Sequence, residues 1–209
     1  GLCVRLKQWG RWTGMNKNCL LCGGGGQGVV LASRLIAYAA MEKGNFVRTA
    51  ETIGMAQRGG SVVSHVRIGD DIYSPQVPVG SADVILAFEP GEAVRCLPYL
   101  KKDGLVIADS RIVKPVTASL GGSSYNAEEM TAYLEKHAGK LILIDGEAIC
   151  REAGSPKVLN VALLGAAAQS GVLGITPEEM LDAVRKNVKE KFIALNEKAL
   201  MLGRKAGGM

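Results

Sequence analysis

The amino-acid sequence predicts an α/β domain of three layers, in which helices cover both faces of a mixed β-sheet. Three observations lead to this prediction. Short apolar runs recur along the chain between segments of helical periodicity, as in parallel strands joined by helices. The first such unit contains a glycine-rich loop at 23–28. A β-branched segment at 61–68 alternates in polarity, which predicts an antiparallel pair in the same sheet.

The first unit runs from residue 18 to residue 50. Residues 18–22 are an apolar run ended by glycine, which predicts a buried strand. Residues 29–42 are rich in alanine and leucine and close at Lys43 and Gly44, a basic last turn followed by a glycine cap. Residues 46–50 predict a second strand. It should run parallel to the first and be reached by a right-handed crossover.

The next segment departs from this pattern. Residues 52–60 contain three glycines and predict a loop. Residues 61–68 predict a strand, the turn-like residues 69–71 follow, and residues 72–73 begin a return strand. We therefore expect an antiparallel hairpin here.

The second half of the chain alternates again between strands and helices. Strands are predicted at 82–88, 105–109 and 141–145. Helices are predicted at 90–100, at 127–139 with an Asn126–Glu129 capping box, at 159–171, and from a Thr176-Pro177-Glu178-Glu179 start to about Gly203. Without a repeat or a linker, residues 15–209 are expected to form a single domain.

Composition excludes several classes of protein. The net charge of +5 over 209 residues is concentrated in residues 1–14, which contain three basic and no acidic residues, so nucleic-acid binding is not predicted. No segment approaches the ~18 consecutive apolar residues of a membrane span. The five cysteines are irregularly spaced, unlike a secreted disulfide framework. We therefore expect a cytoplasmic protein without membrane contact.

Residues 1–14 differ from the rest of the chain. They contain both tryptophans, Trp9 and Trp12, and precede Met15, which could be a native start. They lack the apolar stretch of a secretory signal. We interpret them as a leader, either a cloning or start-site extension or a short docking arm.

Cys19 and Cys22 form a C-x-x-C pair within the first predicted strand. One pair cannot supply the four thiolates of an iron–sulfur cluster. No His, Cys, Asp and Glu residues show metal-ligand spacing elsewhere. We expect small buried side chains, with neither a metal site nor a tightly bound cofactor in this chain.

The glycine loop is a candidate anion site. Gly23, Gly25 and Gly28 satisfy G-x-G-x-x-G between a strand and a helix, whose N-terminal N–H groups favour a phosphate. Glu51 lies 23 residues later, about where a ribose-binding acid stands in a dinucleotide fold. NAD binding is therefore one hypothesis. The antiparallel hairpin in place of a crossover helix argues against it, and a tight turn without a ligand is the other alternative.

A longer combination of motifs is far more specific. It consists of CGGGGQG at 22–28, TAETIGMAQRGGSVVSHVRIG at 49–69, YSP at 73–75 and ADVILAFEPGEAVRCLPYL at 82–100. This combination resembles the gamma-type subunits of 2-oxoacid:ferredoxin oxidoreductases, in particular those of enzymes that act on indolepyruvate and other aryl pyruvates. The resemblance covers Met15 to about Leu202 and leaves out residues 1–14.

The resemblance implies a Rossmann-like gamma domain and a role in a complex. Such enzymes decarboxylate a 2-oxoacid on thiamine diphosphate, pass two electrons through iron–sulfur clusters to ferredoxin, and release an acyl-CoA. The large partner subunit holds thiamine diphosphate and the clusters, so the isolated chain would be inactive. This domain would pack over the thiamine site and help to bind coenzyme A (CoA). Related enzymes for 2-oxoglutarate or branched-chain oxoacids are an alternative, as is a stand-alone NAD-binding protein.

The resemblance also assigns candidate site residues. The loop expected to contact a CoA phosphate or the partner comprises Gly24, Gly25, Gly26, Gln27 and Gly28, with Gln27 standing where related pyruvate enzymes have a hydroxyl residue. The loop expected to face the partner's active site comprises Glu51, Met55, Gln57, Arg58, Gly59, Gly60 and Ser61. Arg58 is the candidate catalytic residue, because a guanidinium can pair with a carboxylate or phosphate. Alternatively it forms a structural ion pair, for instance with Glu51.

Two further polar residues leave alternatives open. His65 lies within an alternating strand and is either a structural histidine or a base. Asn160 stands near the start of the buried helix and either caps it or contacts the site.

Overall fold

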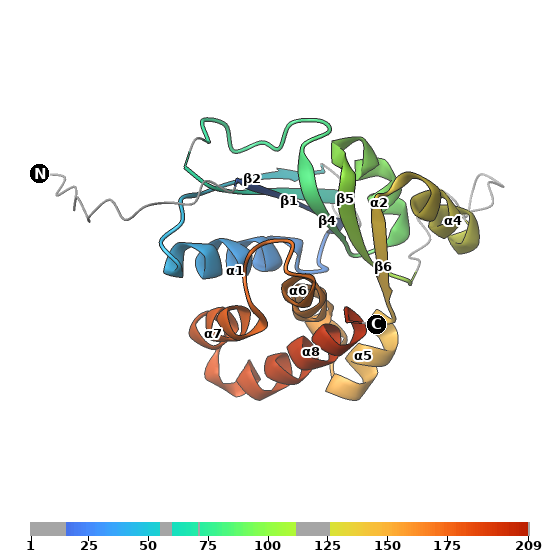
Figure 1. Cartoon of the computed structure of the whole chain (residues 1–209). Helices are drawn as coiled ribbons and strands as arrows, with labels where there is room; N and C mark the ends of the chain where they lie inside the picture. Colours follow the sequence, from blue (N-terminus) through green and yellow to red (C-terminus); the bar gives the residue numbers. More distant parts are fainter. Residues whose placement is uncertain (1–15, 55–59, 71, 112–125, 209) are drawn as a thin grey trace, which may run out of the picture.

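The computed structural model describes residues 16–54, 60–70, 72–111 and 126–208. Its centre is one six-stranded sheet with the order β2-β3-β1-β4-β5-β6 (Figure 1). The strands are Lys17–Gly24 (β1), Val47–Ile53 (β2), Ser61–Ile68 (β3), Ala82–Ala87 (β4), Leu100–Asp109 (β5) and Lys140–Ile144 (β6). The α-helices are Val29–Glu42 (α1), Pro90–Cys96 (α2), Ala127–His137 (α4), Gly146–Ala153 (α5), Leu159–Ser170 (α6), Pro177–Asn187 (α7) and Ile193–Ala206 (α8). Short 3-10 helices are Leu97–Tyr99, Pro156–Val158 and Glu190–Phe192.

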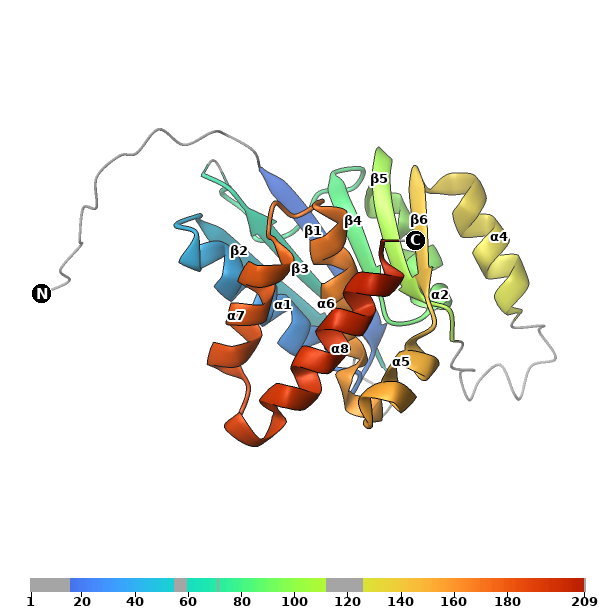
Figure 2. The same cartoon turned by 60° about the horizontal axis from the view of Figure 1, so that its bottom comes forward.

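Helices cover both faces of the sheet, which confirms the three-layer α/β prediction. Helices α1 and α6 lie against one face, and α5, α7 and α8 pack around them (Figures 1 and 2). Helices α2 and α4 belong to the opposite face. Successive strand residues point to opposite sides, so Leu21 belongs to the α1 side of the core and Leu20 to the α2 side. The apolar strands predicted from the sequence are therefore buried on both faces.

The sheet is mixed, as predicted, but one strand pairs differently. Strands β1, β4, β5 and β6 are parallel, while β3 is antiparallel to both β1 and β2. The predicted parallel direction of β1 and β2 is thus confirmed, although β3 separates them. The expected hairpin between 61–68 and 72–73 is wrong, since β3 forms its hairpin with β2. Both edges of β3 are occupied, so no edge remains for a return strand.

Residues after β3 instead cross the face of the sheet that α1 does not cover. Arginines of the two neighbouring strands donate to backbone carbonyls of this segment: Arg48 to Ile72, and Arg67 to Ser74 and Gln76. Two apolar side chains of the segment itself, Ile72 and Val77, are buried. These arginine contacts satisfy carbonyls that a strand ladder would otherwise satisfy.

His65 also holds the segment that follows β3. Its contact there leads us to expect that the free energy of unfolding depends on pH. Its Nδ1 accepts the N–H of Val77 at 3.1 Å, which requires the neutral ring, and burial lowers the pKa of His65. The unfolded chain therefore binds this proton more readily than the folded one. We expect the free energy of unfolding to fall as pH decreases below about 6.5, the ordinary histidine pKa.

Urea unfolding at pH 7.5 and pH 5.5 measures this effect. His65→Gln should reduce the difference between the two pH values, and His137→Gln, which removes an exposed histidine on α4, should leave it in place. An equal pH difference in wild type and His65→Gln would contradict the prediction.

Several helix boundaries differ from the prediction. Helix α2 ends at Cys96 and not at Leu100, because Pro98 cannot continue an α-helix. The single helix predicted from Thr176 to about Gly203 is two helices, α7 and α8. Helix α7 ends before Val188, which has an extended conformation. Helix α5 was not predicted, although the Asp145 side chain caps its start and Gly154 ends it in the left-handed region.

The predicted helix caps are confirmed with one change. Thr176 and Glu179 form the capping box of α7, with Pro177 in the first turn. Asn126 caps α4, but its side chain accepts from the N–H of Glu128 and not from that of Glu129. Within the described ranges, no helix combines the length and apolarity needed to cross a bilayer.

Candidate functional site

The candidate site lies at the carboxyl ends of β1 and β4, where the direction of the chain connections changes. Helix α1 follows β1 on one face of the sheet, and α2 follows β4 on the other. In open α/β sheets this switch point forms a crevice that binds ligands. The glycine loop 24–28 leaves β1 here, and Glu89 leaves β4.

The glycine loop is held in one conformation by its own side chain and by β3. The N–H of Gly24 donates to Oε1 of Gln27 at 2.6 Å, and the N–H of Gly25 donates to the carbonyl of Gly60 at 2.9 Å. Gly26 and Gly28 have φ values of 91° and 87°, which favour glycine. Gln27 thus braces the loop from within, through the acceptor oxygen at the end of its side chain.

Gly28 is also the N-cap of α1, and no side chain caps this helix. The first N–H groups of a helix have no intrahelical partner and attract anions. The nearest side chain to Gly28 is Asn160, since a Cβ built on Gly28 would lie 2.8 Å from its Nδ2. The N-cap of α6 is Val158, so Asn160 does not cap that helix and instead contacts the glycine loop.

Buried carboxylates lie close to the glycine loop, at the start of α2. The Ser61 hydroxyl donates to Oε2 of Glu92 at 2.6 Å, and Glu92 also lies 3.3 Å from Nη2 of Arg95. Glu89 is similarly buried, with its Oε1 3.6 Å from a Cβ built on Gly24. The Ser61 hydroxyl therefore ties the start of β3 to α2 through a carboxylate that also pairs with Arg95.

The structure brings some predicted site residues together and separates another. Gly24–Gly28 adjoin Gly60 and Ser61, because β1 and β3 pair Gly24 with Ser61. Glu51 lies on the exposed edge strand β2, opposite Ser64, and two strand spacings, about 10 Å, from β1. The NAD hypothesis required this acid beside the first strand, so the sheet order does not support it. Residues outside the described ranges are Met55, Gln57, Arg58 and Gly59.

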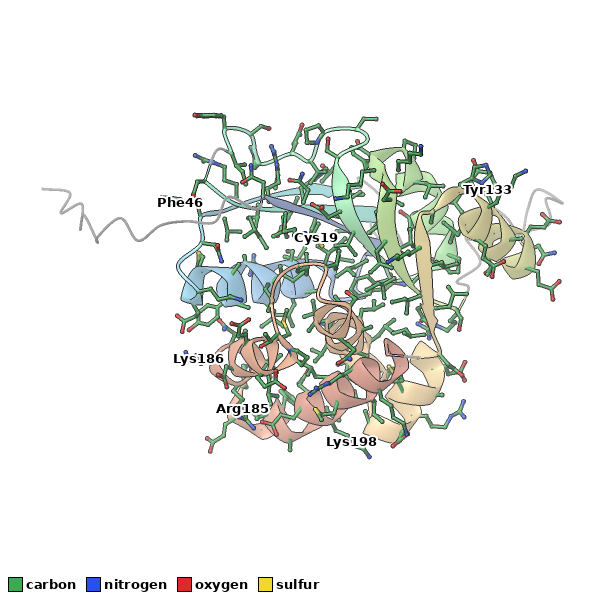
Figure 3. The ribbon with its side chains drawn as sticks, in the orientation of Figure 1. Cys19, Phe46, Tyr133, Arg185, Lys186 and Lys198 are labelled. Atoms are coloured by element: carbon green, nitrogen blue, oxygen red, sulfur yellow. The ribbon has the colours of Figure 1, made fainter. Side chains whose placement is uncertain are left out.

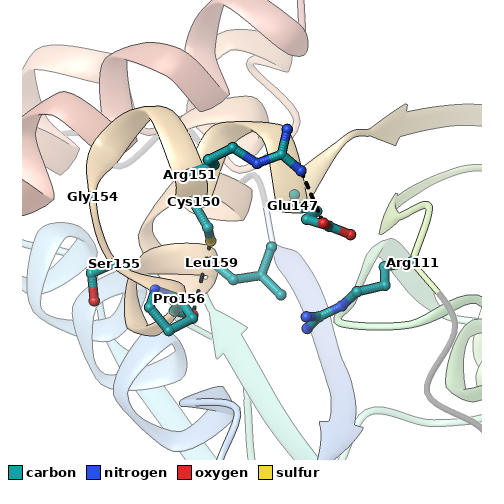
Figure 4. Close-up of a pocket in the computed structure, with 9 residues that line it drawn as sticks. Arg111, Glu147, Cys150, Arg151, Gly154, Ser155, Pro156 and Leu159 are labelled. Atoms are coloured by element: carbon teal, nitrogen blue, oxygen red, sulfur yellow. Dashed lines mark hydrogen bonds and ion pairs between the residues drawn. The ribbon is translucent and has the colours of Figure 1, made fainter.

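A cavity of about 330 Å³ at α5 and the start of α6 was not predicted. Its lining includes Arg111, Gly146, Cys150, Arg151 and Leu159 (Figure 4). Buried Asp109 lies behind it at the end of β5 and accepts N–H groups of Gly146 at 3.0 Å and Arg111 at 3.3 Å. Burial raises the pKa of the Asp109 carboxyl, although these two amides favour its charged form. In the sequence, the only local sign of this cavity was Asp109 at the end of a predicted strand, with Arg111 two residues later.

The cysteines of the first strand are buried, as predicted, but lie on opposite faces. Cys19 points toward α1 (Figure 3), whereas Cys22 points toward α2. Cys22 shares a hydrogen bond with Cys96. This bond and burial both raise the pKa of the Cys22 thiol, whereas the same bond lowers the pKa of the Cys96 thiol against the effect of burial. Among the described residues, no group of three or more His, Cys, Asp and Glu side chains could hold a metal ion.

Comparisons with known proteins agree on one family. The family model described as pyruvate ferredoxin/flavodoxin oxidoreductase matches residues 18–206. The chain is 42% identical to indolepyruvate oxidoreductase subunit IorB of Pyrococcus horikoshii over 191 residues, which cover 90% of this chain and 95% of the relative. It is 31% identical to the pyruvate/ketoisovalerate oxidoreductases common subunit gamma of Thermococcus kodakarensis, over 84% of this chain and 87% of that one.

A solved structure has the same fold. It is 2-oxoglutarate:ferredoxin oxidoreductase from Magnetococcus marinus, with 2-oxoglutarate, coenzyme A and succinyl-CoA bound. The TM-score is 0.70 at 19% identity, and the match covers 92% of this chain and 31% of that one.

Proposed function

Because the chain belongs to the pyruvate ferredoxin/flavodoxin oxidoreductase family, we propose that it is the small subunit of a cytoplasmic 2-oxoacid:ferredoxin oxidoreductase that acts on indolepyruvate or another aryl pyruvate. The observation that carries the proposal is the 42% identity to an indolepyruvate oxidoreductase subunit over nearly the whole length of both chains. The product would be an acyl-CoA.

We propose a division of labour between this chain and a large partner subunit. Thiamine diphosphate and the iron–sulfur clusters are assigned to a large partner subunit, and electrons reach ferredoxin through that partner. The assignment is compatible with two features of this chain: its C-x-x-C cysteines point to opposite faces, and the described residues contain no group of three or more His, Cys, Asp and Glu side chains that could hold a metal ion. The isolated chain is accordingly expected to be inactive.

The glycine loop is proposed to bind a phosphate of CoA. The uncapped N-terminus of α1, the four glycines Gly24, Gly25, Gly26 and Gly28, which leave the backbone accessible, and the position at the switch point all favour an anion there. Gln27 contributes by holding the loop open toward the N–H groups of the helix. The related solved structure from Magnetococcus marinus has coenzyme A bound.

A second candidate keeps the same reaction and changes the substrate. The 31% identity to a subunit shared by pyruvate and ketoisovalerate oxidoreductases favours a smaller or branched oxoacid. The oxoacid pocket would lie mostly in the partner, so only substrate assays distinguish the two candidates.

Affinity purification of the chain from its native cells under anaerobic conditions tests the proposal. A large iron–sulfur partner should co-purify, and the complex should reduce a dye in the presence of indolepyruvate and CoA. Activity with only another oxoacid would support the second candidate. A lone, colourless chain that binds NAD would contradict both.

Arg58→Ala is expected to lower the activity of this complex or its use of CoA, because a guanidinium beside the active site would lose a carboxylate or phosphate contact. An effect of about tenfold or more corresponds to the loss of one charge-assisted hydrogen bond. Steady-state kinetics with varied CoA measures it, and circular dichroism should show an unchanged fold.

Arg185→Ala is the matched control for this prediction. Arg185 lies on α7 and pairs with Glu197 and Asp182 at the surface, so its loss should barely change activity. If the Arg58→Ala complex kept full activity, Arg58 would not be a functional residue.

A further inference from the structure

Arg111 lies in the cavity beside the glycine loop and has no part in the function proposed above. Asp109 contacts both the backbone and the side chain of Arg111. The backbone N–H of Arg111 donates to Oδ1 of Asp109, and Nε of Arg111 lies 3.8 Å from Oδ2 of Asp109. No described residue accepts a hydrogen bond from Nη1 or Nη2 of Arg111. The side chain is 44% exposed, and its guanidinium points into the cavity (Figure 4).

The other charged side chains of the cavity are already paired with each other. Nη2 of Arg151 lies 2.9 Å from Oε1 of Glu147, so these two charges offset each other. Asp109 stands behind Arg111 and is fully buried. Within the described part of the cavity, Arg111 is therefore the cation with no carboxylate at Nη1 or Nη2, and an arginine of this kind recognises a phosphate or carboxylate.

The start of α6 lies between the cavity and the glycine loop. Leu159 lines the cavity, and the next residue, Asn160, lies against Gly28 at the N-terminus of α1. An anion at the N-terminus of α1 and an anion at Arg111 would thus flank the same turn. A ligand that satisfies both must carry two separate anionic groups.

We propose that Arg111 binds a second phosphate, so that the site selects a nucleotide phosphorylated at two positions of its ribose. The inference rests on the CoA binding proposed above, since CoA carries a 5′-pyrophosphate and a separate 3′-phosphate. The pyrophosphate occupies the glycine loop, and the 3′-phosphate pairs with Arg111. Asp109 is a positioning residue, because it touches the arginine and not the ligand.

Calorimetric titration of the full chain with CoA and with 3′-dephospho-CoA tests this inference, because the two ligands differ only in the phosphate in question. Wild type should bind CoA at least about tenfold more tightly, the loss expected when one charge-assisted contact is removed. Arg111→Gln should abolish this difference and leave the affinity for 3′-dephospho-CoA unchanged. Arg151→Gln, which alters a paired arginine of the same cavity, should retain the difference.

The outcomes separate this inference from the function on which it rests. If wild type binds neither ligand, the proposed CoA contact fails and the inference fails with it. If wild type binds both ligands equally, or if Arg111→Gln weakens both by the same factor, the inference is overturned while the CoA contact stands. Equal unfolding midpoints of wild type and Arg111→Gln must accompany the comparison.

Discussion

Gly203→Ala is expected to lower the free energy of unfolding by about 3 kcal/mol. Helices α6 and α8 cross so closely that a Cβ on Gly203 would lie 1.9 Å from the carbonyl oxygen of Ala162. On the other helix, a Cβ on Gly165 would lie 2.1 Å from the carbonyl oxygen of Leu200. Both obstacles are backbone atoms of buried helices, which cannot move aside as a flexible side chain can. The added methyl group must push the two helices apart.

Urea unfolding followed by circular dichroism measures this loss. Gly208→Ala is the matched control, because it lies two residues after the end of the same helix and its Cβ would meet nothing closer than 3.6 Å. That variant should change stability by less than about 0.5 kcal/mol. Similar effects of the two substitutions would show that the helix crossing tolerates a methyl group.

Gly28→Ala should destabilise the protein by about 2–3 kcal/mol and weaken CoA binding. The residue has a φ of 87°, which is unfavourable for alanine, and its Cβ would lie 2.8 Å from Nδ2 of Asn160. Asn160 is buried and also accepts the N–H of Val161, so it cannot turn away freely. The start of α1 must therefore shift, and with it the N–H groups proposed to bind phosphate.

Gly26→Ala separates the two causes of this effect. Gly26 lies in the same loop with a φ of 91°, but a Cβ there would have no atom within 4 Å. It should cost only the backbone strain, about 1 kcal/mol. Unfolding midpoints and CoA titrations of both variants provide the comparison. An equal loss of stability in both would mean that Asn160 does not restrict Gly28.

Much of the parallel half of the sheet could be predicted because its signals are local. Apolar runs indicated β1, β4, β5 and β6, and the Thr176 capping box fixed the start of α7. The combination of motifs at 22–28, 49–69, 73–75 and 82–100 indicated the family, which the family model confirms. Helix α5 was missed although its capping residues were visible, because eight residues give little periodicity.

The wrong predictions share a physical cause. Residues 72–73 have the composition of a strand, yet β3 already has a neighbour on each side, which no local pattern reveals. The last helix continues in periodicity past Val188, yet the chain turns there so that Gly203 can meet α6. In both cases packing between distant segments overrides local propensity.

The sequence by itself determined the types of most elements, the glycine loop and the family, because periodicity, caps and motifs depend on residues a few positions apart. Only the tertiary structure decided which strand separates β1 from β2, and hence that Glu51 stands away from the glycine loop. It also decided that Asn160 faces Gly28, and that Asp109, 37 positions before Gly146, holds Arg111 at the cavity. These contacts join residues far apart in the chain, and their geometry exists only once the sheet has assembled and the helices have packed on it.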